Sequence, residues 1–160
     1  MVQDLIHGVL ISPLNEISDN RGAVLHMMRS DTEGFTQFGE CYFSEILPGA
    51  VKAWKKHTLQ TQNLAVPVGS VQLVMYDNRQ SSPTKGQLSI LELGRPHAYL
   101  RVTIPPGIWY GFTCTGATPA LLANCTDLPH SKTESEILAS DDISIPYSWN
   151  TPDVKKNDNS

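Results

Sequence analysis

Several features are scarce in this sequence of 160 residues, and each scarcity argues against a class of protein. No apolar run reaches the about 18 residues that a membrane-spanning helix needs, so we predict no membrane span. The first 22 residues lack a basic segment followed by a long apolar one, so no secretory signal is expected. Basic residues are outnumbered by acidic ones, 12 to 16. A net charge of −4 argues against nucleic acid or a membrane surface as a partner.

Cysteine is scarce too, with three widely spaced residues, Cys41, Cys114 and Cys125. An odd number without any Cys-x-x-Cys pair is not the pattern of a disulfide framework or of a structural zinc site. Reduced thiols of this kind are typical of a cytoplasmic protein, and we expect the protein to be located there.

Helix signals are few, whereas short runs rich in β-branched and aromatic residues recur between turns that contain Gly and Pro. Only one short helical turn is expected, over 131–140, with Ser131 as its cap. This pattern predicts an all-β sandwich or barrel. The expected strands cover residues 22–30, 39–47, 51–57, 62–68, 70–77, 87–93, 98–104, 110–116 and 119–126. We expect one domain over residues 1–149, followed by a flexible polar tail at 150–160.

Two glycines, Gly49 and Gly69, enclose an unusual concentration of polar side chains. Between them stand Lys55-x-His57 and Gln62, at the spacing at which the cupin superfamily places Gly, His-x-His, Glu and Gly. The stretch therefore resembles the first cupin signature with most of its metal ligands replaced.

The second cupin signature, Pro-x-Gly-x-x-His-x-x-x-Asn, is similar to the stretch "PPGIWYGFTC". Pro105 and Gly107 keep their places, Tyr110 stands in the His position and Cys114 in the Asn position. The glycine framework of a cupin is present in both signatures, and the ligand positions have changed.

The residues in those ligand positions predict that no metal is bound. A divalent metal needs about three or four converging N, O or S donors. Lys55 is normally an ammonium without a free lone pair, Gln62 is a weak neutral ligand and Tyr110 is normally protonated. His57 remains as a good ligand, and one imidazole does not hold a metal.

Four further motifs occur in the order found in one metal-independent branch of the cupins. They are "DNRG" (19–22), "DNRQSSPTKG" (77–86), "IPPGIWYGF" (104–112) and "CTD" (125–127) followed by Glu134. Over residues 15–149 the chain resembles the dTDP-4-dehydrorhamnose 3,5-epimerase family. The resemblance implies a cupin-type double-stranded β-helix, or jelly-roll barrel, without cofactor. It also implies a nucleotide-linked 4-keto-6-deoxy sugar as substrate and a homodimer as the assembly.

The catalytic positions of that family are occupied by other residues here. The family uses a His base oriented by an Asp, a Tyr acid and a Lys that stabilises the enolate. Lys55 stands in the place of the His, Asn63 in that of the Lys and Ala123 in that of the Tyr. The orienting Asp lies in a segment beyond "IPYSW" that this sequence lacks. An unchanged 3,5-epimerase mechanism is therefore not expected.

The binding positions have changed as well. Lys52 stands in the place of a family Arg, and a Gln-x-Asn-x-Ser strand reads Glu40-x-Tyr42-x-Ser44. On a regular strand Lys52 and Lys56 share the face opposite Lys55, so all three reach one pocket only if the strand is bulged. Either some of these lysines meet a diphosphate, or they form an ordinary charged edge strand.

A substitute set of catalytic residues is available. His57 has the right unperturbed pKa for a base near neutral pH and shares a strand face with Lys55. Lys55 is a second candidate base, and Tyr110 or Tyr42 a candidate acid. We predict His57, Lys55 and Tyr110 as the catalytic residues. The predicted substrate-binding residues are Arg21, Glu40, Tyr42, Lys52, Gln62, Asn63 and Trp109.

Other interpretations of these residues stay open. Arg79 either meets a ligand or pairs with Asp77 and stabilises its turn, and Trp109 is a candidate for simple packing. We expect either a sugar-nucleotide epimerase or isomerase with a changed catalytic set, or a cupin that binds a nucleotide sugar or another carbohydrate without turnover. A single-centre epimerisation or a ketoisomerisation is a third option. In the implied homodimer, Arg21 would reach the neighbouring subunit's site. The sequence does not identify the nucleotide or the sugar.

Overall fold

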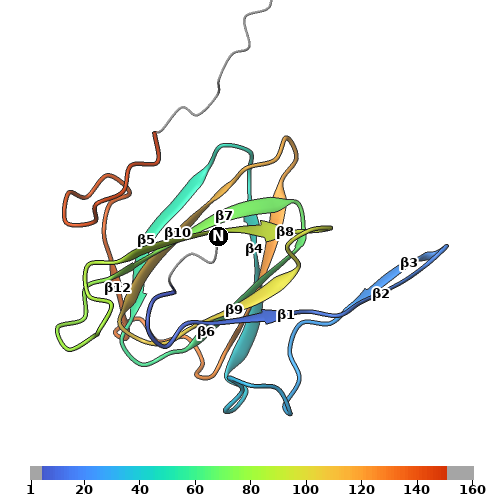
Figure 1. The fold of residues 1–160 in the computed structure, drawn as a ribbon, viewed down its shortest axis with the longest axis horizontal. Helices are drawn as coiled ribbons and strands as arrows, with labels where there is room; N and C mark the ends of the chain where they lie inside the picture. Colours follow the sequence, from blue (N-terminus) through green and yellow to red (C-terminus); the bar gives the residue numbers. More distant parts are fainter. Residues whose placement is uncertain (1–4, 151–160) are drawn as a thin grey trace, which may run out of the picture.

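The computed structural model describes residues 5–150, and every regular element in that range is a β-strand (Figure 1). The strands are β1 (Leu10–Pro13), β2 (Glu16–Asp19), β3 (Gly22–Leu25), β4 (Glu40–Ile46), β5 (Val51–His57), β6 (Gln62–Val68), β7 (Ser70–Asp77), β8 (Leu88–Gly94), β9 (Leu100–Ile104), β10 (Ile108–Cys114), β11 (Ala120–Thr126) and β12 (Ser135–Ile137). Within the described residues no helix is long and apolar enough to span a membrane.

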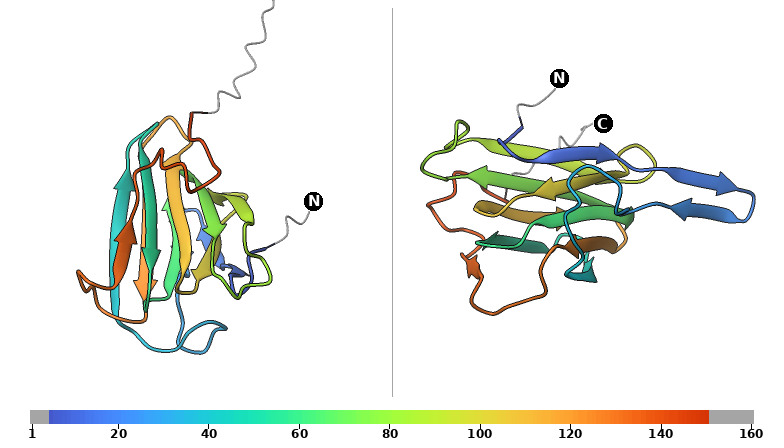
Figure 2. Two further views of the ribbon diagram at one scale, coloured as in Figure 1. Left: turned by 90° about the vertical axis from the view of Figure 1, so that its left-hand side faces the viewer. Right: turned by 90° about the horizontal axis from the view of Figure 1, so that it is seen from below.

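Two five-stranded sheets pack face to face. The first has the strand order β1-β9-β6-β11-β4 and the second β12-β5-β10-β7-β8, and all of their ladders are antiparallel. Figure 2 shows the layers side by side. Most neighbours in each sheet are far apart in sequence, as in a jelly roll. The predicted all-β, cupin-type jelly roll is confirmed.

Alternating side chains of the strands build the core. Val71, Leu73 and Met75 of β7 are fully buried between the two sheets. Val74 points to the outer face of its sheet, where it is equally buried because Ile145 and two tryptophans cover it. The segment after β12 therefore covers the outer face of the second sheet, and β7 carries the apolar Val74 and Tyr76 on that face for this reason.

The predicted helical turn at 131–140 is wrong. The chain makes one turn, closed by a hydrogen bond from the Glu134 amide to the Ser131 carbonyl, and then enters β12. Strand β12 extends the second sheet because Ser135 and Ile137 pair with β5. Strands β1, β2 and β12 lie outside the nine predicted runs, whereas each of those runs contains all or most of a strand. The predicted tail at 150–160 lies, apart from Asn150, outside the described residues.

The turn that begins at Asp77 is stabilised from within. The Asp77 carboxylate is fully buried and accepts hydrogen bonds from Arg79 Nε at 2.9 Å and Nη2 at 2.9 Å. The hydroxyls of Ser82 and Thr84 donate to the same carboxylate at 2.6 and 2.7 Å. Arg79 also donates to the His7 carbonyl at 2.6 Å, which ties the N-terminal segment to the turn. The Asp77–Arg79 pair considered from the sequence is present.

Strands β2 and β3 form a hairpin that extends away from both sheets (Figures 1 and 2). Its cross-strand pair Ile17 and Val24 is exposed, and Arg21 at its tip pairs with Asp19 at 2.6 Å. A lone two-stranded hairpin with exposed apolar residues is marginally stable by itself.

Candidate active site

A pocket of about 310 Å³ opens between the two sheets. Its walls mix apolar side chains with a few hydroxyl, amide and ammonium groups, the usual composition of a small-molecule site. One wall comes from the first sheet and the opposite wall from the second. The lining residues are Tyr42, Ser44, Leu64, Leu122 and Asn124 of the first sheet and Lys52, Ala53, Trp54, Lys55, Tyr110, Phe112 and Ile137 of the second.

A β-bulge brings two lysines into this pocket. Strand β5 pairs Lys55 with Tyr110 and Lys52 with Phe112, so three steps on β5 oppose two on β10. The extra residue turns Lys52 to the face that Lys55 occupies. Lys52 Nζ donates a hydrogen bond to Ser44 Oγ at 2.9 Å across the pocket.

The third lysine of this strand stays outside. Lys56 pairs with Glu136 at 2.5 Å and lies 4.9 Å from the centre of the Trp109 ring. On a regular strand Lys52 and Lys56 would share a face. Because of the bulge they do not, and Lys52 shares the inward face with Lys55 instead.

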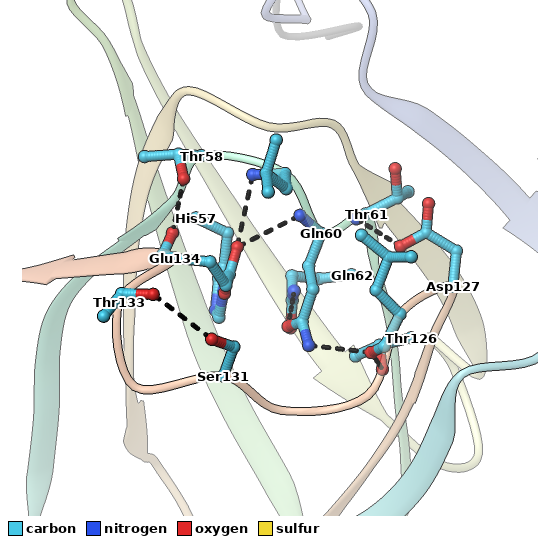
Figure 3. Close-up of polar contacts among 12 residues, drawn as sticks. His57, Thr58, Gln60, Thr61, Gln62, Thr126, Asp127, Ser131, Thr133 and Glu134 are labelled. Carbon is cyan, nitrogen blue, oxygen red and sulfur yellow. Dashed lines mark hydrogen bonds and ion pairs between the residues drawn. The ribbon is translucent and has the colours of Figure 1, made fainter.

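His57 and Glu134 form a buried pair beside the pocket (Figure 3). Their exposed fractions are 3% and 5%, and His57 Nδ1 contacts Glu134 Oε1. The other carboxylate oxygen accepts the backbone N–H groups of Leu59 at 3.2 Å and Gln60 at 3.1 Å. The Glu134 carbonyl accepts the Thr58 amide at 2.8 Å and its hydroxyl at 2.7 Å. These contacts fix the carboxylate and thereby the orientation of the imidazole.

Tyr110 connects this pair to the pocket. Its hydroxyl lies 3.2 Å from His57 Nε2, and Tyr110 lines the cavity whereas His57 does not. With the Nδ1 proton donated to Glu134, the free lone pair on Nε2 accepts the Tyr110 hydroxyl. The result is a carboxylate–imidazole–phenol chain whose outer member faces the ligand space.

The pKa values fit this protonation pattern. Burial lowers the pKa of His57 below its ordinary value, and the Glu134 carboxylate offsets only part of that effect. Burial alone would raise the pKa of Glu134, but the hydrogen bonds from His57, Gln60 and Leu59 outweigh it and lower that pKa. Burial strongly raises the pKa of Tyr110. Near neutral pH the chain is therefore an ionised Glu134, a neutral His57 and a protonated Tyr110.

Several of the predicted binding residues lie at or directly behind the pocket wall. Tyr42 lines the pocket and accepts a hydrogen bond from Asn124 at 2.9 Å. Gln62 lies buried behind Asn124 and accepts from it at 2.6 Å. Burial raises the pKa of the Tyr42 phenol, and Glu40, two residues earlier on β4, raises it further, although Glu40 does not line the pocket.

The structure does not bring the other three predicted binding residues to the pocket. Asn63 points to the other side of its strand, where it accepts the Thr103 hydroxyl at 2.7 Å and donates to the Cys125 carbonyl at 3.1 Å. Trp109 points away from the pocket because it alternates with Tyr110, and it packs in the outer apolar cluster. Arg21 lies at the tip of the β2–β3 hairpin.

Two residues of the candidate site, Glu134 and Asn124, were not predicted as part of it. Glu134 was noted only for its place in a motif, and the expected helix at 131–140 concealed its position beside His57. Asn124 was not singled out, although an amide between apolar residues of a buried strand is a recognisable signal of an internal hydrogen bond. Both contacts join residues more than 60 positions apart.

The donor set at the cupin ligand positions does not suit a metal. Lys55, Gln62 and Tyr110 occupy three of these positions, and His57 is engaged by Glu134. In the part of the chain that the structure describes, no three His, Cys, Asp or Glu side chains come together as a metal-binding group.

A jelly roll with this pocket, two lysines and a carboxylate–imidazole–phenol chain has the architecture of a cupin enzyme that works by acid–base chemistry. The profile of the dTDP-4-dehydrorhamnose 3,5-epimerase family matches residues 3–160, and the chain belongs to that family. The expected class of enzyme, a sugar-nucleotide epimerase and thus an isomerase, is confirmed.

Three relatives illustrate the membership. The spore coat polysaccharide biosynthesis protein SpsL of Bacillus subtilis is 31% identical over 149 residues, which cover 92% of this chain and 98% of SpsL. The probable low-salt glycan biosynthesis epimerase Agl13 of Haloferax volcanii is 35% identical over 121 residues, 74% and 77% of the two chains. The crystal structure of a dTDP sugar isomerase from Desulfovibrio desulfuricans is 54% identical, has a TM-score of 0.88 and aligns over 90% of this chain and 92% of its own.

Proposed function

We propose that the protein epimerises a carbon next to the ketone of a nucleotide-linked 4-keto-6-deoxy sugar, with Tyr110 as the residue that meets the reacting carbon. The observation that carries this proposal is the position of Tyr110, whose hydroxyl lies against His57 while its side chain lines the pocket. The names of two relatives, a glycan biosynthesis epimerase and a dTDP sugar isomerase, support this substrate class.

Proton removal runs through the chain of three residues. As the C–H bond next to the ketone breaks, Tyr110 Oη takes that proton and passes its own hydroxyl proton to His57 Nε2. The electron pair of the C–H bond moves to the ketone, which becomes an enolate. Glu134 stabilises the imidazolium that forms, as the carboxylate of a catalytic triad does. Tyr110 stays a neutral phenol throughout, so its raised pKa does not oppose the step.

The two pocket lysines supply positive charge where the substrate is negative. Lys55, which is paired with Tyr110 across the ladder, is placed to stabilise the developing enolate oxygen. Lys52, held by Ser44, is placed for the diphosphate of the nucleotide. Loss of Lys55 should lower kcat, and loss of Lys52 should mainly raise KM.

The test is exchange of carbon-bound protons with solvent. The dTDP-, CDP- and GDP-linked 4-keto-6-deoxyhexoses are each incubated with the enzyme in deuterated water, and label at C3 and C5 is followed by NMR. We expect exchange at one or both carbons with at least one of these substrates, together with the epimer. Tyr110→Phe and His57→Asn should abolish it, whereas Lys56→Ala, on the outer face, should not. Absence of exchange with all three nucleotides would contradict the proposal.

One observation favours a second candidate, a cupin that binds a nucleotide sugar without turnover. Ala123, in the position of the family's Tyr, offers no hydroxyl for catalysis. This candidate predicts saturable heat of binding in calorimetry and no deuterium uptake by the same substrates.

We also propose that the protein is a homodimer, in which the β2–β3 hairpin carries Arg21 to the neighbouring subunit's pocket. The exposed pair Ile17 and Val24 on this hairpin supports the proposal, because docking would cover it. Exposed apolar side chains on the first sheet, such as Phe43 and Val68, offer further contact area. We also propose that the protein is located in the cytoplasm, and its three free cysteines support this location.

A further inference from the structure

The Asn124 side chain has only one orientation that satisfies its neighbours. Its Oδ1 accepts the backbone N–H of Asn63 at 3.1 Å, and a backbone N–H can only donate. Nδ2 must therefore be the atom that faces Tyr42 Oη, at 2.9 Å, and Gln62 Oε1, at 2.6 Å. Asn124 is 1% exposed, so water does not replace these partners.

Two further buried amides, Gln62 and Gln60, continue this series and fix the direction of its hydrogen bonds at the end away from Tyr42. Gln62 Nε2 donates to Gln60 Oε1 at 3.1 Å, and Gln60 Nε2 donates to the Leu128 carbonyl at 2.7 Å. Figure 3 shows the Gln60 and Gln62 part of this chain close to the His57–Glu134 pair. A backbone carbonyl can only accept, so the direction of every donor in the series from Asn124 to Leu128 is fixed.

The fixed polarity decides what the Tyr42 hydroxyl can do. Because Asn124 donates to Tyr42 Oη, the phenol oxygen is an acceptor in this contact and keeps its own proton for another partner. Among the described residues, no hydrogen bond takes that proton. Tyr42 is 38% exposed and lines the pocket, so the hydroxyl proton is available to a ligand there.

Tyr42 and Tyr110 reach the pocket from opposite walls. Tyr42 belongs to β4 of the first sheet and Tyr110 to β10 of the second. A planar enolate bound between the sheets would present one face to each phenol. Epimerisation requires this arrangement, since the proton must leave on one face and return on the other.

We infer that Tyr42 is the catalytic acid that protonates the enolate on the face opposite Tyr110, and that Asn124, Gln62 and Gln60 position its hydroxyl. The inference rests on the proposed epimerase function. The Tyr42 proton passes to the ring carbon, the enolate electron pair forms the new C–H bond, and the ketone is restored. The resulting phenolate keeps the Asn124 hydrogen bond and regains one proton from water, while His57 returns its one extra proton to solvent through the Tyr110 hydroxyl.

The protonation state of Tyr42 agrees with this role. Burial raises the pKa of Tyr42, and the carboxylates of Glu40 and Glu134 raise it further against the effect of the Asn124 hydrogen bond. The phenol therefore holds its proton near neutral pH until a strongly basic carbon lies beside it.

The experiment compares proton exchange with inversion in Tyr42→Phe, a variant that keeps the ring and is expected to fold. Wild-type enzyme and variant are given dTDP-4-keto-6-deoxyglucose in deuterated water, and both deuterium uptake and formation of the epimer are followed by NMR. CDP- and GDP-linked substrates replace it if they are the ones the wild type uses. We expect the variant to retain exchange within about tenfold and to lose inversion by about 10²-fold or more. A second form with 3,5-difluorotyrosine at position 42, whose phenol is more acidic, should move the alkaline limit of inversion to lower pH and leave exchange unchanged.

The outcomes separate this inference from the proposed function. If the wild-type enzyme exchanges protons and Tyr42→Phe inverts the carbon as fast as the wild type, the role of Tyr42 is overturned and the epimerase proposal stays intact. Equal loss of exchange and inversion would also overturn it, because Tyr42 would then act in binding or in proton removal. No exchange by the wild type with any of the three nucleotides would overturn both. Loss of inversion alone, with the shifted alkaline limit, supports it.

Discussion

At the scale of single residues, Glu134 determines which nitrogen of His57 carries the proton. One carboxylate oxygen faces His57 Nδ1 and the other accepts two backbone N–H groups, from Leu59 and Gln60. An amide in place of the carboxylate has a single acceptor oxygen for both tasks. If that oxygen stays with the two N–H groups, the NH₂ group faces Nδ1 and forces the proton onto Nε2.

Glu134→Gln should therefore lower kcat for proton exchange by about 10²–10⁴-fold. The proton on Nε2 prevents His57 from accepting the Tyr110 hydroxyl, which interrupts the chain. KM should change little because Glu134 does not line the pocket. Steady-state kinetics of deuterium uptake gives both values. The matched control is Glu136→Gln on the outer face, which should leave kcat unchanged; equal losses in both variants would argue against the orienting role.

The pH dependence of exchange should report the state of His57. The neutral imidazole is the active form, so kcat/KM falls as the pH drops through the pKa of His57. Burial lowers that pKa, which places the acidic limit below the ordinary histidine value of 6.5. Burial raises the pKa of Tyr110, so this residue causes no loss up to about pH 9. Initial rates between about pH 4.5 and 9 measure the profile, and an acidic limit above pH 7 would contradict the assignment.

The sequence identified some residues of this site and missed others for a physical reason. His57, Lys55 and Tyr110 were found because the glycine framework fixes their register on two neighbouring strands. Glu134 is 77 positions away from His57, and the pair forms because β12 pairs with β5 and two loop amides hold the carboxylate. No local pattern encodes such a contact.

At the scale of elements, the bulge in β5 determines the charge of the pocket. A regular strand would have turned Lys52 away from Lys55, and the bulge turns both inward. The strands themselves were predictable from β-branched runs between Gly and Pro turns. From the sequence, the bulge could be given only as a condition for these lysines to reach one pocket. Alternation within one strand does not show where its pairing partner skips a residue.

The Asp77 turn leads to a prediction about stability and pH. Burial alone would raise the pKa of Asp77, but donors from Arg79, Ser82 and Thr84 outweigh it and hold that pKa far below 3.8. A depressed pKa in the folded state stabilises the protein above the unfolded value, and the benefit is lost as the pH falls towards the folded value. Asp77→Asn should thus cost about 3 kcal/mol at neutral pH, with the difference narrowing below about pH 3.8.

Urea unfolding of both proteins at several pH values tests this. The control is Asp31→Asn, whose ion pair with Arg29 is exposed, and no measurable change is expected there. A difference between wild type and Asp77→Asn that stays constant down to about pH 2 would show that ionisation of Asp77 is not the cause.

At the scale of the whole molecule, the two sheets bury their apolar side chains within the chain, whereas the β2–β3 hairpin does not. The sheets bury a continuous apolar core between them, and that core follows from the alternation of the strands. The hairpin has no such support within the described residues, and its Ile17 and Val24 remain exposed. The jelly roll could be predicted from one chain, whereas the role proposed for the hairpin involves a second one.

If Arg21 completes the neighbouring pocket, two defective variants should complement each other. Arg21→Ala and Tyr110→Phe should each be impaired alone, since every pocket lacks one of the two groups. In a mixed dimer, the pocket of the Arg21→Ala subunit receives Arg21 from its partner and is intact.

After unfolding and refolding of an equimolar mixture, about half of the dimers are mixed and one pocket in each is complete, so about a quarter of wild-type activity should return. Light scattering gives the oligomeric state, and the control mixture is Lys55→Ala with Tyr110→Phe, which share one pocket and should not recover. A monomer at micromolar concentration, or no recovery in the first mixture, would contradict the shared site.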